Sequence, residues 1–262
     1  MVTFLHTGDW HVGKAIRGRS RADEHAAVLT EIAAVAEREA VDAVLVAGDL
    51  YDSAAPTPES ERTVYEALLA LSAGGTRPVL VIAGNHDSAP RLAAVAPVFA
   101  AHGVSIVARP SRADDGGVVE VDTDGGRLRV ALLPFPSQRV AATVDDLMER
   151  RVDEHTGNYA GRVARLLDHV TEPFDADAVN VVLAHLMVMG GTMGGGERGA
   201  HTVFEYWVPA TSFPATAHYV ALGHLHRAQR LDAPSPVHYA GAPLQLDFGE
   251  TANQPSVNLV RA

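Results

Sequence analysis

Short apolar runs alternate with longer amphipathic segments over the first 110 residues of the chain. Each run has the length and the apolar content of a strand that is buried in a sheet. The runs lie at residues 2–7, 42–47, 78–83 and 105–108. The segments between and after them predict helices at residues 22–40, 58–73 and 91–102. This alternation favours an α/β fold built on a largely parallel sheet that is covered on both faces.

The pattern changes after residue 110. Residues 118–122 and 128–133 alternate apolar and polar positions on either side of Asp124-Gly125-Gly126, which predicts a β-hairpin. A helix is predicted at residues 158–171, with Asn158 as its N-cap. Further strands are predicted at residues 179–184, 219–222, 228–231, 237–240 and 256–260. We expect this half to form a second sheet packed on the first, which gives a four-layer αββα sandwich of two mixed sheets in a single domain, residues 1–262.

A glycine-rich segment at residues 190–199 separates two of these strands. Two interpretations of it stay open. It is either a substrate-facing loop beside a functional site or a flexible surface connection, and the sequence favours neither.

The composition limits the chemistry that the chain can use. Of 262 residues, 47% are hydrophobic and 20% are charged, which is typical of a folded core. There is no cysteine, so disulfides, thiolate nucleophiles and cysteine-bound zinc are excluded. No apolar stretch reaches the ~20 residues of a membrane span, and the N-terminus carries no basic leader. We expect a cytoplasmic protein without membrane association.

The charge distribution bears on nucleic-acid binding. The formal net charge is −11, which argues against binding through a broad basic surface. Bound divalent ions would reverse the field locally. A basic segment at residues 12–21 offers Lys14, Arg17 and Arg19 as candidate nucleic-acid contacts. Lys14 is the only lysine of the chain, and genomic composition bias explains the preference for arginine better than function does.

Polar side chains with metal-binding or acid–base chemistry follow five of the predicted strands. They are Asp9, His11, Asp49, Asp52, Asn85, His86, His185, His224 and His226. Each cluster alone is explained by a turn or a helix cap, but five clusters at five strand exits are not. Alternate residues of an extended segment point the same way, so Asp9 can act with His11, and His224 with His226. Mixed carboxylate and imidazole ligands suit manganese, iron or zinc, and their number exceeds what one tetrahedral ion needs.

The order of these motifs resembles that of the calcineurin-like metallophosphoesterases. The matching motifs are Asp9-x-His11, Gly48-Asp49-x-x-Asp52, Gly84-Asn85-His86-Asp87, His185 and Gly223-His224-x-His226. Flanking segments are similar to the SbcD exonuclease branch of that family, and the similarity covers essentially the whole chain. These segments are residues 6–13, Arg21-x-x-Glu24-His25, residues 47–53, 223–227 and 241–245.

The resemblance implies a role for each matching residue. Asp9, His11 and His226 would hold one metal ion, and Asn85, His185 and His224 would hold a second. Asp49 would bridge the two ions, for which the family prefers manganese. His86 would protonate the leaving oxygen or stabilise the transition state, and the Asp52 carboxylate would orient the His86 imidazole.

The resemblance also implies a function. It predicts a manganese-dependent DNA nuclease with 3′→5′ exonuclease and endonuclease activity, which acts in recombination and double-strand-break repair with an SbcC-like ATPase. Members of the branch continue into a DNA-capping domain and an ATPase-binding segment, which we expect to be absent from this chain. They also form homodimers through the helices predicted at 58–73 and 91–102. Apolar residues there would form the seam, although a core-facing stripe explains them equally well: Val64, Leu68, Leu71, Leu92, Val95 and Phe99.

Two alternatives to the DNA nuclease remain at the level of sequence. The first is a phosphoesterase of the same fold that acts on a small phosphodiester or a phosphoprotein. The second is a scaffold on an inactive phosphoesterase fold, but such a chain should have lost ligands, and all seven are present together with His86.

Overall fold

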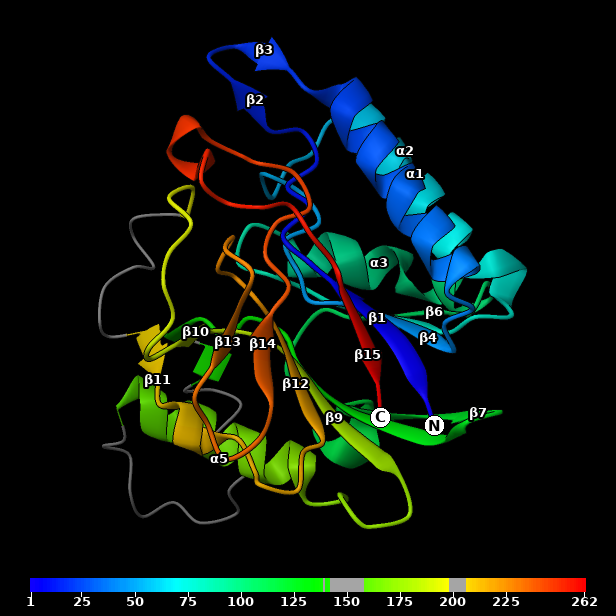
Figure 1. Ribbon diagram of the computed structural model, residues 1–262, viewed down its shortest axis with the longest axis vertical. Coiled ribbons are helices and arrows are strands. Elements are labelled where there is room, and N and C mark those ends of the chain that lie inside the picture. The colour runs from blue at the N-terminus through cyan, green and yellow to red at the C-terminus, as the bar shows by residue number, and fades with distance from the viewer. Residues whose placement is uncertain (139, 142–157, 198–205) are drawn as a thin grey trace.

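Two large sheets stacked face to face form the centre of the described part of the chain (Figure 1). The computed structural model describes residues 1–138, 140–141, 158–197 and 206–262. The first sheet contains β1 (Thr3–Thr7), β4 (Ala43–Val46), β5 (Val79–Ile82), β6 (Val104–Val107) and β15 (Asn258–Arg261). Its order is β15-β1-β4-β5-β6, and all neighbours are parallel except β15 and β1.

The second sheet is also mixed. It contains β7 (Val118–Thr123), β8 (Gly126–Leu133), β9 (Val179–His185), β12 (Tyr219–Gly223), β13 (Gln229–Leu231) and β14 (Val237–Tyr239). Its order is β13-β14-β12-β9-β8-β7, with a parallel centre and an antiparallel strand at each edge. The predicted αββα sandwich of two mixed sheets is therefore confirmed.

One strand differs from the expectation that the second half of the chain forms the second sheet. β15 returns to the first sheet and pairs antiparallel with β1, with Phe4 opposite Val260. The two ends of the chain are tied by paired hydrogen bonds between Val2 and Ala262, at 2.8 and 2.9 Å. This pairing satisfies the edge of β1, which would otherwise expose its backbone groups.

The outer layers are helical. The helices α1 (Ala22–Arg38), α2 (Pro58–Leu71) and α3 (Ala89–Ala100) cover the first sheet, and α5 (Tyr159–Thr171) covers the second (Figure 1). Asn158 caps α5 as predicted, because its side chain accepts a hydrogen bond from the Gly161 N–H. No helix in the described ranges is long and apolar enough to cross a membrane.

Each pair of adjacent layers encloses its own apolar core. The core between the two sheets includes Phe4, Leu45, Leu80, Leu128 and Leu183, all fully buried. The outer cores lie between the helices and the sheets. The residues considered for a dimer seam belong to the α2–α3 side of the first outer core, so the core-facing interpretation of that stripe holds. They are Val64, Leu68, Leu71, Leu92 and Phe99, with Val95 packed against them.

Several short elements were not predicted from the sequence, because two or three residues show no periodicity. Four of them are two-residue strands that form two pairs. β2 (Ala15–Ile16) pairs with β3 (Arg19–Ser20), and β10 (Met187–Val188) pairs with β11 (Trp207–Val208). The 3₁₀ turns are η1 (Ala73–Gly75), η2 (Ala113–Asp115), η5 (Ala210–Ser212) and η6 (Phe248–Glu250). In Figure 1, the β2–β3 hairpin stands at the same end of the molecule as η6.

Candidate metal centre

The polar clusters predicted at the strand exits come together where the carboxyl ends of the two sheets meet. The Asp9 carboxylate accepts hydrogen bonds from the His224 N–H, at 2.9 and 3.1 Å. The Asp49 carboxylate accepts one from the His86 N–H at 2.8 Å. The Asn85 Oδ1 atom lies 2.9 Å from His185 Nε2. Residues more than 200 positions apart in the chain thus meet at one point.

Glycines allow this close approach of backbone to side chain. A Cβ atom on Gly84 would lie 2.1 Å from Asp49 Oδ1, and one on Gly223 would lie 2.0 Å from the Ala47 carbonyl oxygen. Gly48 requires glycine for two reasons. Its φ of +88° is in the left-handed region, and its Cβ would lie 2.6 Å from His185 Nδ1. The φ of Gly84 is not in the left-handed region, so the space needed beside Asp49 is the reason for glycine at this position.

At four of the candidate ligand positions the backbone is not extended, contrary to the expectation from the sequence. Asp9, His11 and Asp49 have φ of 52°, 46° and 51°, and His224 has φ 106°. These left-handed conformations turn each side chain out of its strand and cost free energy that the surrounding contacts must offset. His224 and His226 consequently serve two different groups of side chains instead of one.

The candidate ligands form two groups, and Asp49 lies at the boundary between them. Asp9, His11 and His226 offer ligand atoms within 4.8 Å of one another, and so do Asp49, His185 and His224. Asp49 Oδ2 lies 3.5 Å from His11 Nε2 and 3.4 Å from His185 Nε2. The Asp49 carboxylate therefore stands between the two groups, where a bridging ligand has to be.

Asn85 adds its amide oxygen to His185 and His224 of the second group, and these three side chains have the spacing of metal ligands. The Asn85 Oδ1 atom lies 2.7 Å from His224 Nδ1, and His224 Nδ1 lies 3.1 Å from His185 Nε2. Neighbouring ligands at right angles around an ion, each about 2.1 Å from it, are about 3.0 Å apart. An amide oxygen and two imidazole nitrogens are ligands that manganese, iron and zinc accept.

Buried hydrogen bonds direct the imidazole nitrogens toward the ligand groups. His185 donates through Nδ1 to the Ala47 carbonyl oxygen at 2.7 Å, and His226 donates through Nδ1 to the Glu250 carboxylate at 2.7 Å. Each bond leaves Nε2 as the ligand atom, as in metal-bound histidines generally. His11 Nε2 is buried and has no hydrogen-bond partner among the described residues, which a cation would supply. The residues present therefore fit a pair of divalent cations.

The electrostatics of the cluster also favour cations. Burial raises the pKa of Asp9 to about 6, because the charged form is poorly solvated there. Burial alone would raise the pKa of Asp49 too, but the His185 charge and hydrogen bond hold it well below its usual range. In the same way, burial lowers the pKa of His185, but the Asp49 charge outweighs this and brings it to about 9. Burial lowers the pKa of His11 to about 4, so its imidazole is neutral and ready to bind a cation.

His86 lies beside the first group, and its contact with Asp52 differs from the expected one. His86 Nδ1 donates to the main-chain carbonyl oxygen of Asp52 at 2.8 Å. The Asp52 carboxylate turns instead toward His11 Nδ1 at 3.6 Å and Lys14 Nζ at 3.3 Å, because the ammonium group attracts it. The His86 ring stands edge-on to His11 with centroids 4.5 Å apart, and His86 also lies within ligand distance of His11 and Asp49.

The three candidate nucleic-acid contacts lie near one another but in different environments. Lys14 is half-buried beside Asp52. Arg17 occupies the turn of the β2–β3 hairpin, where its guanidinium lies 5.1 Å from the ring centroid of Phe248. Arg19 is exposed on β3. Arg21 then ties the hairpin to the C-terminal region through a hydrogen bond to the Gln245 carbonyl oxygen.

Sequence reasoning missed several carboxylates at the site, among them Glu250 and Asp87. Glu250 binds His226 from η6, and no local spacing signals a partner 24 residues away. Asp87 belongs to the motif that was singled out but had no role. Its carboxylate accepts from the N–H groups of Gly84, Tyr51 and Leu50, at 2.9, 3.1 and 3.3 Å. Asp87 thereby joins the turns that carry Asp49 and Asn85.

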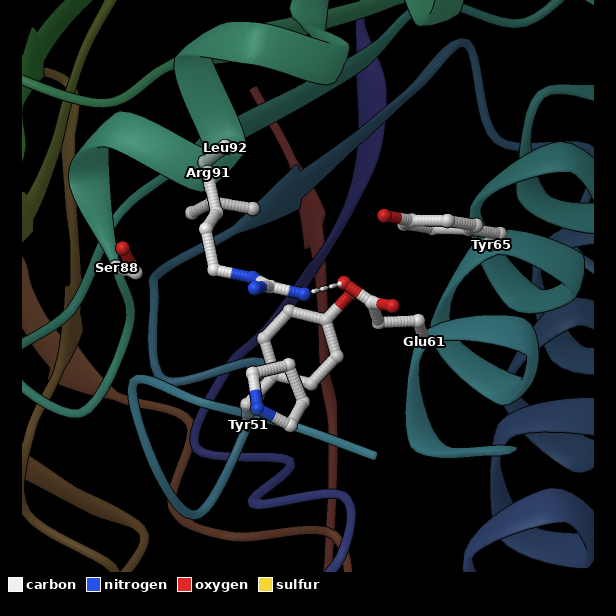
Figure 2. Close-up of a pocket in the computed structure, with 7 residues that line it drawn as sticks. Tyr51, Glu61, Tyr65, Ser88, Arg91 and Leu92 are labelled. Carbon is white, nitrogen blue, oxygen red and sulfur yellow. Dashed lines mark hydrogen bonds and ion pairs between the residues drawn. The ribbon is translucent and has the colours of Figure 1, made fainter. Parts of the chain in front are cut away.

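A small cavity beside the Asp52 turn is not a substrate site. Tyr51, Glu61, Tyr65, Ser88 and Arg91 are among the residues that line it (Figure 2). Its volume is about 10 Å³, room for about one water molecule. The Arg91 guanidinium and the Glu61 carboxylate meet across it at 2.5 Å.

Comparison with known proteins bears on the family of this chain. The profile of the calcineurin-like phosphoesterase family matches residues 2–228. Curated proteins described as the SbcD subunit of the nuclease SbcCD are 38% identical in Bacillus subtilis strain 168, over 261 residues, and 30% identical in Escherichia coli K12, over 269 residues. These alignments cover 98% of this chain but 66% and 64% of the relatives, so the chain spans less than two thirds of their length.

Two solved structures share the fold. The protein TT1561 of Thermus thermophilus superposes with a TM-score of 0.51 at 18% identity, covering 92% of this chain and 89% of that one. A dimetal phosphatase from Danio rerio gives a TM-score of 0.51 at 14% identity, covering 92% and 87%. At such identities the likeness concerns the fold alone.

The pKa values predict that manganese binding strengthens as the pH rises. His185, with its pKa at about 9, must lose a proton to act as a ligand, and below pH 6 Asp9 holds a second one. We expect the affinity on the His185 side of the centre to rise about tenfold per pH unit from pH 6 to 8.5, and the affinity on the Asp9 side to rise with pH below pH 6, where Asp9 loses its proton. Competition titration with a metal indicator across this range measures it. An affinity that does not change between pH 6 and 8.5 would contradict this electrostatic picture.

Proposed function

The chain belongs to the calcineurin-like phosphoesterase family, and on that basis we propose that it is a manganese-dependent DNA nuclease that hydrolyses phosphodiester bonds. The observation that carries the proposal is the position of Asp49 between two groups of ligand atoms. The curated relatives that match nearly the whole chain are called nucleases, which favours DNA over other phosphoesters. The proposed activity is 3′→5′ exonucleolytic and endonucleolytic.

In this proposal the two groups hold one manganese ion each. Asp9, His11 and His226 form one position, Asn85, His185 and His224 form the other, and Asp49 contributes to both. When bound, such a pair of cations neutralises phosphate charge and lowers the pKa of the attacking water. The buried Nδ1 hydrogen bonds of His185 and His226 keep their rings in place for this task.

His86 is the proposed general acid. Its Nδ1–H donates to the Asp52 carbonyl oxygen, which fixes the ring and assigns Nε2 to the substrate. Nε2 of the protonated ring would give its proton to the leaving oxygen, a step that typically contributes about 10²–10⁴-fold to the rate. Asp52 would orient two imidazoles at once, His86 through its carbonyl oxygen and His11 through its carboxylate.

The β2–β3 hairpin is the proposed contact for the DNA backbone. Arg17 lies over Phe248 of η6, whose Glu250 binds the His226 imidazole, and Arg19 adds a second exposed positive charge on β3. A chain with a net charge of −11 needs such local positive charge to hold DNA near the metal centre. Lys14 contributes less in this proposal, because Asp52 neutralises part of its charge.

The relatives are subunits of a nuclease called SbcCD, from which we infer a role with an SbcC-like ATPase in recombination and double-strand-break repair in the cytoplasm. A homodimer through α2 and α3 would use the side chains that these helices expose. Leu69 on α2 is 41% exposed and Val98 on α3 is 66% exposed, unlike the buried stripe beneath them.

End-labelled DNA distinguishes the proposed nuclease from a phosphoesterase with a small substrate. We expect the purified chain with manganese to degrade linear duplex, hairpin or single-stranded DNA, and to stop when the metal is chelated. Cleavage of a chromogenic phosphodiester without any digestion of DNA would favour the small-substrate alternative. Metal analysis that finds no manganese bound at neutral pH would favour an inactive scaffold.

Replacing His86 separates catalysis from metal binding. We expect His86→Ala to reduce DNA cleavage about 10²–10⁴-fold while the protein still binds two manganese ions, because His86 gives a proton and is not a ligand. Calorimetric titration with manganese measures the stoichiometry. Because His86 also lies within ligand distance of His11 and Asp49, loss of one bound ion in this variant would show that it is a ligand.

Replacing the hairpin arginines tests the DNA contact. We expect Arg17→Ala/Arg19→Ala to weaken DNA binding and to reduce the slope of log affinity against log salt by about 0.9 for each lost phosphate contact on duplex DNA. Arg127→Ala is the matched control, because Arg127 is an exposed arginine on β8, which pairs with β7, and Figure 1 shows β7 far from β2 and β3. Equal salt slopes for both variants would remove the hairpin from the DNA-binding surface.

A further inference from the structure

Two carboxylates from separate segments hold His226 on the side away from the other ligands. Glu250 Oε1 accepts the Nδ1–H of His226 at 2.7 Å, and Glu250 Oε2 accepts the Leu246 N–H at 2.6 Å. Glu250 is only 1% exposed, so its charge is poorly solvated and strongly directed at its two donors. The imidazole of His226 is therefore fixed in rotation and in tautomer.

The second carboxylate comes from the glycine-rich segment whose role the sequence left open. Glu197 Oε1 accepts from the N–H groups of His226 and Gly194, at 3.1 and 2.5 Å. Its Oε2 atom accepts the Gly195 N–H at 2.8 Å. Residues 194–197 consequently pack against His226, so this part of the segment lies beside the site, as the first of the two interpretations had it.

Glycine is required where this segment touches the His226–Glu250 pair. A Cβ atom on Gly196 would lie 2.4 Å from Glu250 Oε1 and 3.0 Å from His226 Nδ1. A Cβ atom on Gly194 would lie 2.9 Å from the His226 Cβ. The segment thus covers the hydrogen bond between Glu250 and His226 at a distance that leaves no space for a side chain.

The two sides of the metal centre differ in this respect. His185, on the other side, donates its Nδ1–H to a neutral carbonyl oxygen of Ala47, whereas His226 donates to a buried carboxylate. A carboxylate partner raises the basicity of an imidazole ligand and with it the affinity for the metal. In addition, the Asp9–His11–His226 side contains the Asp9 carboxylate, whereas the Asn85–His185–His224 side contains no carboxylate of its own.

From these contacts we infer that Glu250 is a positioning residue that sets the metal affinity of the Asp9–His11–His226 side, and that residues 194–197 hold it in place. This inference rests on the proposed two-metal function. Glu250 is not itself a candidate ligand and acts through the His226 imidazole, to which it is hydrogen-bonded. The two metal positions are then unequal, and Glu250 makes the first of them the tighter one.

Glu250→Gln tests this inference with little change of shape. Glu250 uses a separate oxygen for each of its two donors, and glutamine replaces one oxygen by an NH2 group, so the variant loses a hydrogen bond or forces His226 into the tautomer with the proton on Nε2. We expect calorimetric manganese titration to show one site weakened about 10–100-fold and the other unchanged. Electron paramagnetic resonance should show the spin-coupled pair of ions only at correspondingly higher manganese concentration.

A second pair of variants perturbs the same bond from outside. Gly196→Ala should displace the Glu250 carboxylate from His226 and weaken the same site. Gly249→Ala is the matched control, because its Cβ would lie 3.4 Å from Asp247 Oδ1, an ordinary contact, and its φ is not in the left-handed region. This control should bind manganese like the wild type. If Glu250→Gln fails to fold, the manganese affinities of Gly196→Ala and Gly249→Ala test the inference instead.

The outcomes separate the inference from the proposed function. Wild-type protein that does not bind two manganese ions contradicts the proposed function itself. Wild-type protein that binds two, together with unchanged affinities in Glu250→Gln and Gly196→Ala, overturns the inference alone. Thermal unfolding without metal is the structural readout: a variant that lowers the unfolding temperature but leaves both affinities intact assigns Glu250 a purely structural role and also overturns the inference.

Discussion

The structure depends on the burial of two carboxylates, Asp9 and Asp49, at the junction of its two sheets. Both are almost completely inaccessible to solvent, and a buried charge is costly unless it is paired and hydrogen-bonded. Asp9 accepts from the His224 N–H, and Asp49 accepts from the His86 N–H and lies between two imidazoles. A pair of cations would balance the negative charge of the two carboxylates that these contacts do not compensate. The site therefore has the character of a metal centre.

The fold brings these groups together through backbone features that would otherwise be unfavourable. Left-handed φ angles at Asp9, Asp49 and His224 aim the side chains away from their strands, and glycines leave space where strands and turns touch. Ligands come from both sheets, so the centre exists only when the sheets are packed on each other. The apolar layer between the sheets is therefore also what holds the site in place.

The surroundings of the ligands connect the metal centre to the surface of the protein. The turn that contains Glu250 also carries Phe248, which is 60% exposed and lies under the Arg17 guanidinium. Arg21 bonds to the Gln245 carbonyl oxygen just before this turn. The basic hairpin and the support of His226 are thus parts of one contiguous set of contacts, at the end of the molecule where DNA would approach.

The sequence by itself determined the layers, most of the strands and helices, and the set of polar residues at the strand exits. These follow from local patterns. An apolar run forms a buried strand in any packing arrangement, and a polar residue that directly follows the run lies at the edge of the sheet. Only the tertiary structure decided that β15 joins the first sheet, that Asp52 reaches His86 through its carbonyl oxygen, and that Glu250 is the partner of His226. The partner of a side chain depends on which distant segments approach it, and no spacing along the chain encodes that distance.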